Sequence, residues 1–166
     1  MGNIPLKKSA QNVQNFCDTQ GINCFVKELS ESTKTSEMAA NTIGCSISQI
    51  IKSLVFKTKI TQKPILILAS GSNRVDEKAI KKHMGENIKK ADADFIREIT
   101  GYAIGGIPPF AHKNKIENVF IDEDLLHFES AWAAAGTPNA VFKLQTKDLE
   151  KLTGGQFVSV KKTGEK

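Results

Sequence analysis

Two short runs of strand-like composition, separated by only a few polar residues, constrain this fold more than any other part of the chain. They are residues 53–57 and 64–70, and the stretch 58–63 between them has turn composition. Runs joined by so short a connection pair as an antiparallel hairpin. The second run is apolar nearly throughout, which is typical of an interior strand.

Further helices and strands are indicated before and after this hairpin. Ser46 and Gln49 have the spacing of a capping box, which predicts a helix of one or two turns leading into the first run. Helical spacing and end signals predict helices at residues 12–20 (ending at Gly21), 36–43 (capped by Thr35 and closed by Gly44), 76–83 and 93–100, and a helix from Thr146 or Lys147 to Gly154. Strands are predicted at residues 24–29, 118–121, 131–135, 140–144 and 157–160, and a polar loop at 30–36.

This mixture of a hairpin with helical crossovers indicates an α/β (α+β) fold with a mixed sheet. The 166 residues are enough for one domain with one core, and the sequence shows no repeat or linker. We therefore expect a single domain over residues 1–166, with flexible ends at 1–8 and 161–166.

Composition excludes several classes of protein. The longest apolar run, residues 64–69, is far too short to cross a bilayer, and the N-terminus lacks a secretory or myristoylation signal, so a cytoplasmic location is expected. Cys17, Cys24 and Cys45 lack C-x-x-C spacing, which predicts reduced, packed thiols. His83, His112 and His127 are too far apart for a recognisable ligand pair. No metal or cofactor is expected.

The net charge of +5 favours an anionic partner such as a nucleic-acid backbone. Arg74 and a basic run that follows it could meet such a backbone, although a solvated helix face is the more usual explanation of such a run. The run consists of Lys78, Lys81, Lys82, Lys89 and Lys90.

Lys52 lies inside the otherwise apolar segment "SISQIIKSLVF". Strand alternation places it on the same face as Leu54 and Phe56, which should be the inward face. Its stem could lie on apolar surface while the ammonium reaches water. Alternatively, the ammonium stands at the mouth of a pocket and attracts a phosphate or a polarised carbonyl.

The segment "GYAIGGIPPF" contains a second candidate site, the loop from Gly105 to Pro109. Its glycines allow close backbone approach and its prolines stiffen it, so free N–H groups could bind an oxyanion or a nucleotide. Ordinary turn chemistry also explains this loop, and residues 136–139 equally. The sequence contains no G-x-S-x-G elbow and no P-loop, and no G-x-G-x-x-G motif opens a helix.

Read together, five segments in order resemble the YbaK and prolyl-tRNA-synthetase-associated editing-domain family, over about residues 35–155. They are "TSEMAANTIGCSISQIIKSLVF", "LILASGSNRVDEKAIKKHMG", "ITGYAIGGIPPFAHK", "VFIDEDLL" and "AWAAAGTPNAVFKL". The resemblance implies a mixed, strongly curved and partly barrel-like sheet flanked by helices. It also implies hydrolysis of the ester that joins a wrong amino acid to tRNA, without metal or cofactor.

The resemblance carries the family's functional lysine onto Lys52 and its G-x-x-x-P loop onto Gly105 to Pro109. We hypothesise that Lys52 anchors a phosphate or carbonyl at the 3′ acceptor end, and that N–H groups near Gly105 and Gly106 orient the ester. Water or a substrate hydroxyl would attack. The remaining substrate-binding candidates are Pro109, Arg74, His112, Gly136, Thr137 and Asn139.

The expected substrate is a tRNA mischarged with a small amino acid such as alanine, serine or threonine. Cysteine is less expected, because after Gly136 only Thr137 and Asn139 are polar. The chain would act free-standing, with a synthetase or an elongation factor as a further partner. A non-catalytic tRNA-binding module of the same fold and a small aminoacyl-ester hydrolase that does not use RNA are the alternatives.

Overall fold

The computed structural model describes residues 6–29 and 35–163. Within them the chain forms one mixed sheet with strand order β1-β7-β6-β2-β3-β5-β8, and β4 pairs with β2 outside this order. The strands are β1 (Lys27–Glu28), β2 (Ile50–Thr58), β3 (Pro64–Ser70), β4 (Ile88–Lys90), β5 (Asn118–Asp122), β6 (Ser130–Ala134), β7 (Ala140–Gln145) and β8 (Gln156–Val158).

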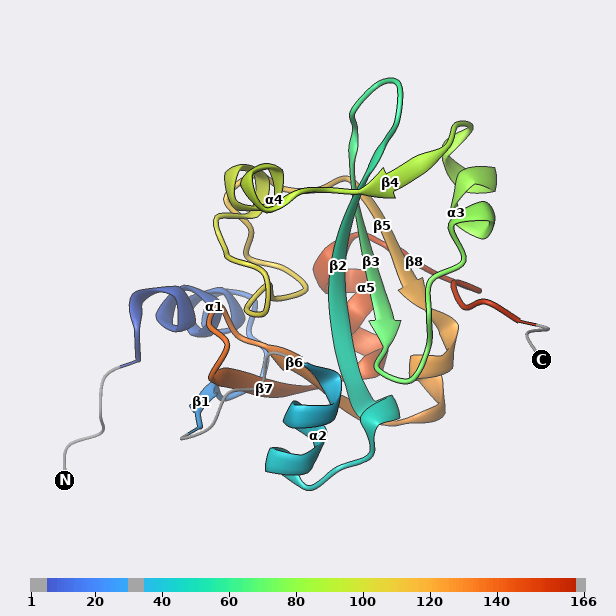
Figure 1. The fold of residues 1–166 in the computed structure, drawn as a ribbon. Coiled ribbons are helices and arrows are strands. Elements are labelled where there is room, and N and C mark those ends of the chain that lie inside the picture. Colours follow the sequence, from blue (N-terminus) through green and yellow to red (C-terminus); the bar gives the residue numbers. More distant parts are fainter. Residues whose placement is uncertain (1–5, 30–34, 164–166) are drawn as a thin grey trace, which may run out of the picture.

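Helices cover the sheet on both sides (Figure 1). They are α1 (Lys8–Thr19), α2 (Ser36–Ile43), α3 (Glu77–Met84), α4 (Ala93–Thr100) and α5 (Leu149–Thr153), with 3₁₀ turns η1 (Ile47–Gln49), η2 (Glu123–His127) and η3 (Thr146–Asp148). In Figure 1, β6 and β7 run across the direction of β2 and β3, so the sheet is strongly curved. The predicted α/β fold with a mixed sheet is confirmed.

The predicted hairpin is also confirmed, and it forms the middle of the sheet. β2 and β3 pair antiparallel from Ile51↔Ser70 to Lys57↔Pro64, while β6 adds parallel to β2 and β5 adds parallel to β3. Alternation along β3 sends Leu66 and Leu68 into one core cluster and Ile65 and Ile67 into a second. Because both faces of β3 are buried, its sequence is apolar nearly throughout.

The two faces of β2 therefore meet different parts of the molecule. Ile51 and Val55 pack in the larger cluster, together with residues of α1, β6 and β7. Phe56 packs in the smaller cluster with Ile80 of α3, and Leu54 packs against it. Lys52 is on the face of Leu54 and Phe56, as strand alternation predicts.

Helix ends agree with the expected capping residues, with one exception. Thr35 accepts a hydrogen bond from the Met38 N–H at 3.1 Å, Asp76 caps α3, and Gly44 closes α2 in the left-handed region at φ 88°. The predicted capping box is wrong: the Ser46 side chain caps no backbone N–H, and only the 3₁₀ turn η1 forms. Strand β2 begins at Ile50, directly after it, so no space remains for a longer helix.

Two further features differ from the expectations. The strand predicted at residues 24–29 forms only at Lys27–Glu28, a short pairing with β7. Strand β4 was not predicted, and it places Lys89 and Lys90 on a sheet edge and not on a helix face. Such a short edge strand carries too little alternation to be seen in a sequence. Part of the loop predicted at 30–36, residues 30–34, lies outside the described residues.

The expectation of three reduced cysteines is corrected. Cys17 and Cys24 form a disulfide, with their Cα atoms 6.5 Å apart, while the thiol of Cys45 is free. The chain turns back after α1 and brings Cys24 against the end of that helix, where both residues are buried. Spacing along the sequence does not reveal this turn. Burial raises the pKa of the Cys45 thiol above its ordinary value.

Both ends of the described chain make contacts. Leu6 packs against the larger core cluster, and Lys161 bridges to Val75 and forms an ion pair with Asp124 at 2.9 Å. The outermost residues, 1–5 and 164–166, lie outside the described part of the chain. No helix within that part is long and apolar enough to cross a membrane.

Replacement of Ile67 by alanine tests the interior position of β3. Ile67 is fully buried, and we expect Ile67→Ala to lower the free energy of unfolding by about 2–5 kcal/mol through lost contacts and a residual cavity. Ile60→Ala is the matched control, because Ile60 is 81% exposed. Urea denaturation of both variants measures the difference, and equal stabilities would contradict the placement of β3.

Candidate functional site

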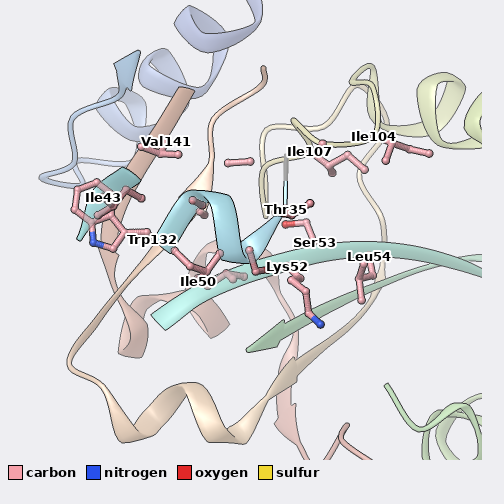
Figure 2. A pocket seen from close by; sticks show the side chains of 16 residues that line it. Thr35, Ile43, Ile50, Lys52, Ser53, Leu54, Ile104, Ile107, Trp132 and Val141 are labelled. Atoms are coloured by element: carbon pink, nitrogen blue, oxygen red, sulfur yellow. The ribbon is translucent and has the colours of Figure 1, made fainter. Parts of the chain in front are cut away.

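A cavity of about 300 Å³ lies between α2, β2, β6 and the loop that contains Gly105. Its wall is mostly apolar and includes Ile50, Ile107 and Trp132 (Figure 2). The few polar groups come from Thr35 and Ser36 at the start of α2 and from Lys52 and Ser53 in β2. A small, mainly apolar pocket with a few polar groups is typical of a small-ligand site.

Lys52 and Ser53 extend to opposite sides of β2, because successive side chains of a strand alternate. In Figure 2 the Lys52 amine points away from the loop at Ile104 and Ile107, and the Ser53 hydroxyl points toward it. The Lys52 Nζ donates a hydrogen bond to the carbonyl oxygen of Asn73. Lys52 thus contributes its backbone and stem to the cavity wall while its charge lies on the side of the turn after β3.

The charge of Lys52 is part of a polar network around Asp122. Burial lowers the pKa of the Lys52 amine, and the nearby Asp122 carboxylate opposes this shift. Asp122 is fully buried and accepts hydrogen bonds from the Ser70 N–H at 3.0 Å and from Asn73 Nδ2 at 2.8 Å. The network therefore ties β2, the turn at 71–75 and the end of β5 together beside the cavity.

Sequence reasoning did not identify Ser53. Its Oγ is buried and has no hydrogen-bond partner within the described residues. A buried hydroxyl without a partner costs free energy, so its retention beside a cavity indicates that a ligand supplies the missing bond. The sequence did offer one signal, because Ser53 directly follows Lys52 in a predicted strand. Successive side chains of a strand point to opposite faces, so Ser53 had to lie on the face opposite Lys52.

The loop with Gly105 and Gly106 is fixed by its own backbone. The Gly106 N–H donates to the Ala103 carbonyl at 3.0 Å, and the Gly106 carbonyl accepts from the Gly136 N–H at 2.8 Å. A Cβ at Gly106 would lie 2.9 Å from backbone atoms of Gly136 and Thr137. The Gly106 N–H is already used, whereas the Gly105 N–H makes no hydrogen bond within the described part of the chain and borders the cavity.

Pro109 and His112 lie on a different cavity. They line a space of about 580 Å³ between α1, the end of the Gly105–Pro109 loop and α5. His112 Nε2 lies 2.7 Å from the Pro108 carbonyl, and burial lowers the pKa of the imidazole, which favours its neutral form. The Nε2–H of a neutral His112 donates to the Pro108 carbonyl and so supports the loop from the side of this second cavity.

The other candidates surround the first cavity without lining it. Gly136 has φ 93°, and a Cβ there would lie 2.6 Å from the Ser9 carbonyl oxygen of α1. Thr137 Oγ1 accepts a 3.3 Å hydrogen bond from the Asn139 N–H, and the Asn139 carbonyl accepts from Leu29. Arg74 is exposed on the turn beyond Asn73. The structure thus brings together Lys52, Gly105 and Ser53, with Gly106, Gly136 and Thr137 as support.

The curved mixed sheet with this cavity beside its central strands is the architecture of an editing domain. The aminoacyl-tRNA editing domain family matches residues 30–152, and the chain belongs to that family. The lysine and glycine loop quoted from the sequence lie inside the matched region.

Known relatives agree with this assignment. A crystal structure described as "a putative trans-editing enzyme for prolyl tRNA synthetase" is 40% identical and covers 95% of this chain and 99% of its own, with a TM-score of 0.88. The uncharacterised protein YwhH of Bacillus subtilis is 35% identical over 128 residues, 77% of this chain and 80% of that protein. Proline–tRNA ligase of Limosilactobacillus fermentum is 27% identical over 105 residues, 61% of this chain but only 18% of the ligase.

Gly106→Ala tests the contact between the loop and residues 136–137. The added Cβ meets backbone atoms, so we expect a loss of about 1–3 kcal/mol in unfolding free energy and a shifted loop. Gly21→Ala is the control, since Gly21 has open space around it and pays only for its φ of 71°, about 1 kcal/mol. Chemical denaturation gives the stabilities. Amide NMR shifts at Gly105 and Ile107 should change only in Gly106→Ala, and unchanged shifts there would contradict the packing.

Lys52→Met tests the energetic role of the half-buried charge. With its pKa lowered in the folded state, Lys52 makes the folded protein bind fewer protons than the unfolded chain between that lowered pKa and 10.5, so this residue's contribution to stability rises with pH over that window. We expect the rise to be missing in Lys52→Met and present in the exposed control Lys147→Met. Urea titrations across the alkaline range measure it, and identical pH profiles for the two variants would refute the assignment.

Proposed function

We propose that this protein is a trans-editing deacylase that hydrolyses the ester of a mischarged aminoacyl-tRNA. The observation that carries the proposal is the cavity itself, within a domain of the editing family. The Gly105 N–H and the Ser53 hydroxyl border it without a hydrogen-bond partner among the described residues, and Lys52 contributes its stem to the wall while its charge lies across β2. Ester hydrolysis needs positioned donors for the developing oxyanion more than a strong nucleophile.

In the proposed reaction, the amino-acid side chain enters the apolar cavity and the ester carbonyl lies near the Gly105 N–H. A water molecule attacks the carbonyl carbon, and the Gly105 N–H stabilises the negative charge on the carbonyl oxygen. If the neighbouring ribose hydroxyl attacks first, the acyl group moves to that oxygen, and water must then attack the new ester to release the amino acid. The bond to the ribose oxygen then breaks, and that oxygen takes up the proton released by the attacking group. Ser53 donates or accepts a hydrogen bond with the bound aminoacyl group, which satisfies its buried hydroxyl.

Lys52 serves the terminal phosphate in this proposal. Its ammonium donates to the Asn73 carbonyl, and the next residue, Arg74, is exposed. After burial, the positive charge of Arg74 is one of the causes that lower the Lys52 pKa. Two neighbouring cations attract a phosphate group that approaches the turn at 71–75. Bound phosphate would replace the unfavourable Lys52–Arg74 repulsion with attraction to both.

The lining of the cavity favours a small amino acid such as alanine, serine or threonine. Among the described residues, its polar lining comes from Thr35, Ser36, Lys52 and Ser53, and Thr137 and Asn139 do not line it. Cysteine has no distinctive partner there. Since one methylene changes discrimination by only about 1–3 kcal/mol, we expect activity on more than one small amino acid.

The remaining parts of the proposal concern context. A protein acting on charged tRNA works in the cytoplasm, needs no metal or cofactor for this mechanism, and could bind a synthetase or an elongation factor. The alternatives, a non-catalytic tRNA-binding module and a hydrolase of small aminoacyl esters, predict respectively no turnover and turnover that is independent of RNA and of salt.

A deacylation panel tests the proposal. Wild-type protein should hydrolyse at least one of the Ala-, Ser-, Thr-, Cys- and Pro-charged tRNAs well above background, with alanine or serine ahead of cysteine. We expect Lys52→Ala and Ser53→Ala to lower the rate by roughly tenfold or more, as loss of one well-placed hydrogen bond does. The matched controls Lys147→Ala and Ser159→Ala, both at exposed positions away from the cavity and the turn at 71–75, should react like the wild type.

Two outcomes would contradict the proposal. If no charged tRNA in the panel is released faster than in buffer, the protein is not a deacylase of this class. If Lys52→Ala and Ser53→Ala both retain the full rate while the wild type is active, the site is elsewhere on the molecule. Thermal unfolding of each variant separates a damaged fold from a damaged site.

A further inference from the structure

A groove of about 1070 Å³ lies on the side of the sheet away from α1, between α3, the start of β4, the β2–β3 turn and the end of the described chain. In Figure 1 these segments surround α3 at the opposite side of the molecule from β6 and β7. We call this surface the lysine groove. Five lysines line it, Lys59, Lys78, Lys81, Lys82 and Lys162.

The lysine groove carries uncompensated positive charge. Each of the five lysines is exposed, and none forms an ion pair within residues 6–29 and 35–163, where the Lys161–Asp124 pair is the one found. Two carboxylates, Asp76 and Glu77, also border the groove, but the Asp76 side chain caps α3 by accepting a hydrogen bond from the Lys78 N–H at 3.1 Å. The local balance is therefore strongly positive.

Helix electrostatics does not explain this gathering. Lys81 and Lys82 lie in the last turn of α3, where the helix dipole stabilises cations. Lys78 lies near the start of α3, where the same dipole opposes a cation, and Lys59 and Lys162 come from other segments. Like charges brought together from separate elements repel one another, which indicates that an anionic partner offsets the repulsion.

The backbone holds the walls of the groove in place. The Lys59 N–H donates to the Asn87 carbonyl at 2.8 Å, and the Lys162 N–H donates to the Arg74 carbonyl at 2.9 Å. The Asp76 N–H donates to Val160 at 2.7 Å, so α3 begins fastened to the end of the chain. These bonds fix the elements that carry the lysines before any ligand binds.

Hydrogen bonds link the groove to the turn that Lys52 contacts. The Lys52 Nζ donates a hydrogen bond to the Asn73 carbonyl. Arg74 follows Asn73 in the chain, and its carbonyl accepts a hydrogen bond from the N–H of Lys162 in the groove. Cations thus succeed one another from Lys52 through Arg74 to Lys162 and α3. Lys89 and Lys90, which belong to the same basic run in the sequence, lie on β4 and do not line the groove.

We propose that the lysine groove binds the phosphate backbone of the RNA acceptor stem whose 3′ end reaches the cavity. A broad groove with flexible ammonium groups suits a sequence-independent contact to successive phosphates. This assignment rests on the proposed function, which puts the 3′ end of the RNA in the cavity. It adds the surface that contacts the acceptor stem. An acidic protein surface is the competing occupant.

Binding of uncharged RNA tests this proposal apart from catalysis. The probe is a fluorescently labelled RNA hairpin that copies an acceptor stem with a single-stranded ACCA 3′ end. We compare the wild type with the triple variant Lys78→Gln/Lys81→Gln/Lys82→Gln. The control triple variant, Lys113→Gln/Lys147→Gln/Lys151→Gln, removes the same charge from exposed lysines outside the groove.

The groove variant should bind the hairpin roughly tenfold or more weakly, and the slope of log affinity against log salt should fall by roughly two to three, because about one counterion is released per lost phosphate contact. The control triple variant should stay near the wild type. Melting temperatures of both variants should match the wild type, since the substituted side chains are exposed.

Three results would overturn the assignment. The wild type does not bind the hairpin, the groove variant binds as tightly as the wild type, or both triple variants weaken binding equally. In the second case an acidic protein remains the candidate occupant and the RNA assignment is wrong. Ser53→Ala keeps the two proposals apart, because it should lose deacylation while binding the hairpin like the wild type. If binding depends on the groove but no charged tRNA is hydrolysed, the proposed function fails and the groove stands.

Discussion

The structure depends on the burial of both faces of the β2–β3 hairpin. Every apolar residue of β3 contacts one of two core clusters, and β2 shares the same two clusters through alternate side chains. This arrangement makes the hairpin the wall between the larger core and the smaller core under α3. It also means that neighbouring residues of β2 serve different sides of the molecule, which is why Lys52 and Ser53 have different surroundings although they are adjacent.

The position of the Lys52 charge follows from that constraint. An ammonium on an inward-facing strand position must find a partner, because an unpaired buried charge is costly. The Asn73 carbonyl is that partner, and the Asp122 carboxylate offsets part of the desolvation. The lysine consequently fixes the turn at 71–75, so the same group connects the cavity on one side of β2 with the basic surface that begins at Arg74 on the other. Under the proposed function, ester hydrolysis and RNA contact would therefore lie next to one another.

The glycine loop is arranged by a second close approach. Gly106 and Gly136 are hydrogen bonded, and a side-chain carbon has no room at either residue. His112 supports the loop from behind, through Pro108. These contacts hold the loop in place where it borders the cavity, and the Gly105 N–H there makes no hydrogen bond within the described residues. Gly106 and Gly136, which ordinary turn chemistry could also explain, are here required by close backbone packing.

The sequence by itself determined the local structure. The apolar pattern of residues 64–70 and the caps at Thr35, Asp76 and Gly44 were enough for the mixed α/β fold, because these signals depend on near neighbours in the chain. Lys52 and the loop from Gly105 to Pro109 became candidates through the resemblance to editing domains, and their roles stay predictions. Tertiary structure alone decided the long-range contacts. It joined Cys17 to Cys24, placed β4 at an edge and separated His112 and Pro109 from the cavity. It also left the Ser53 hydroxyl without a partner among the residues that the structure describes. It also gathered lysines of distant segments into one groove. The physical reason is that burial, pairing and charge balance are set by atoms that meet only when the chain has folded.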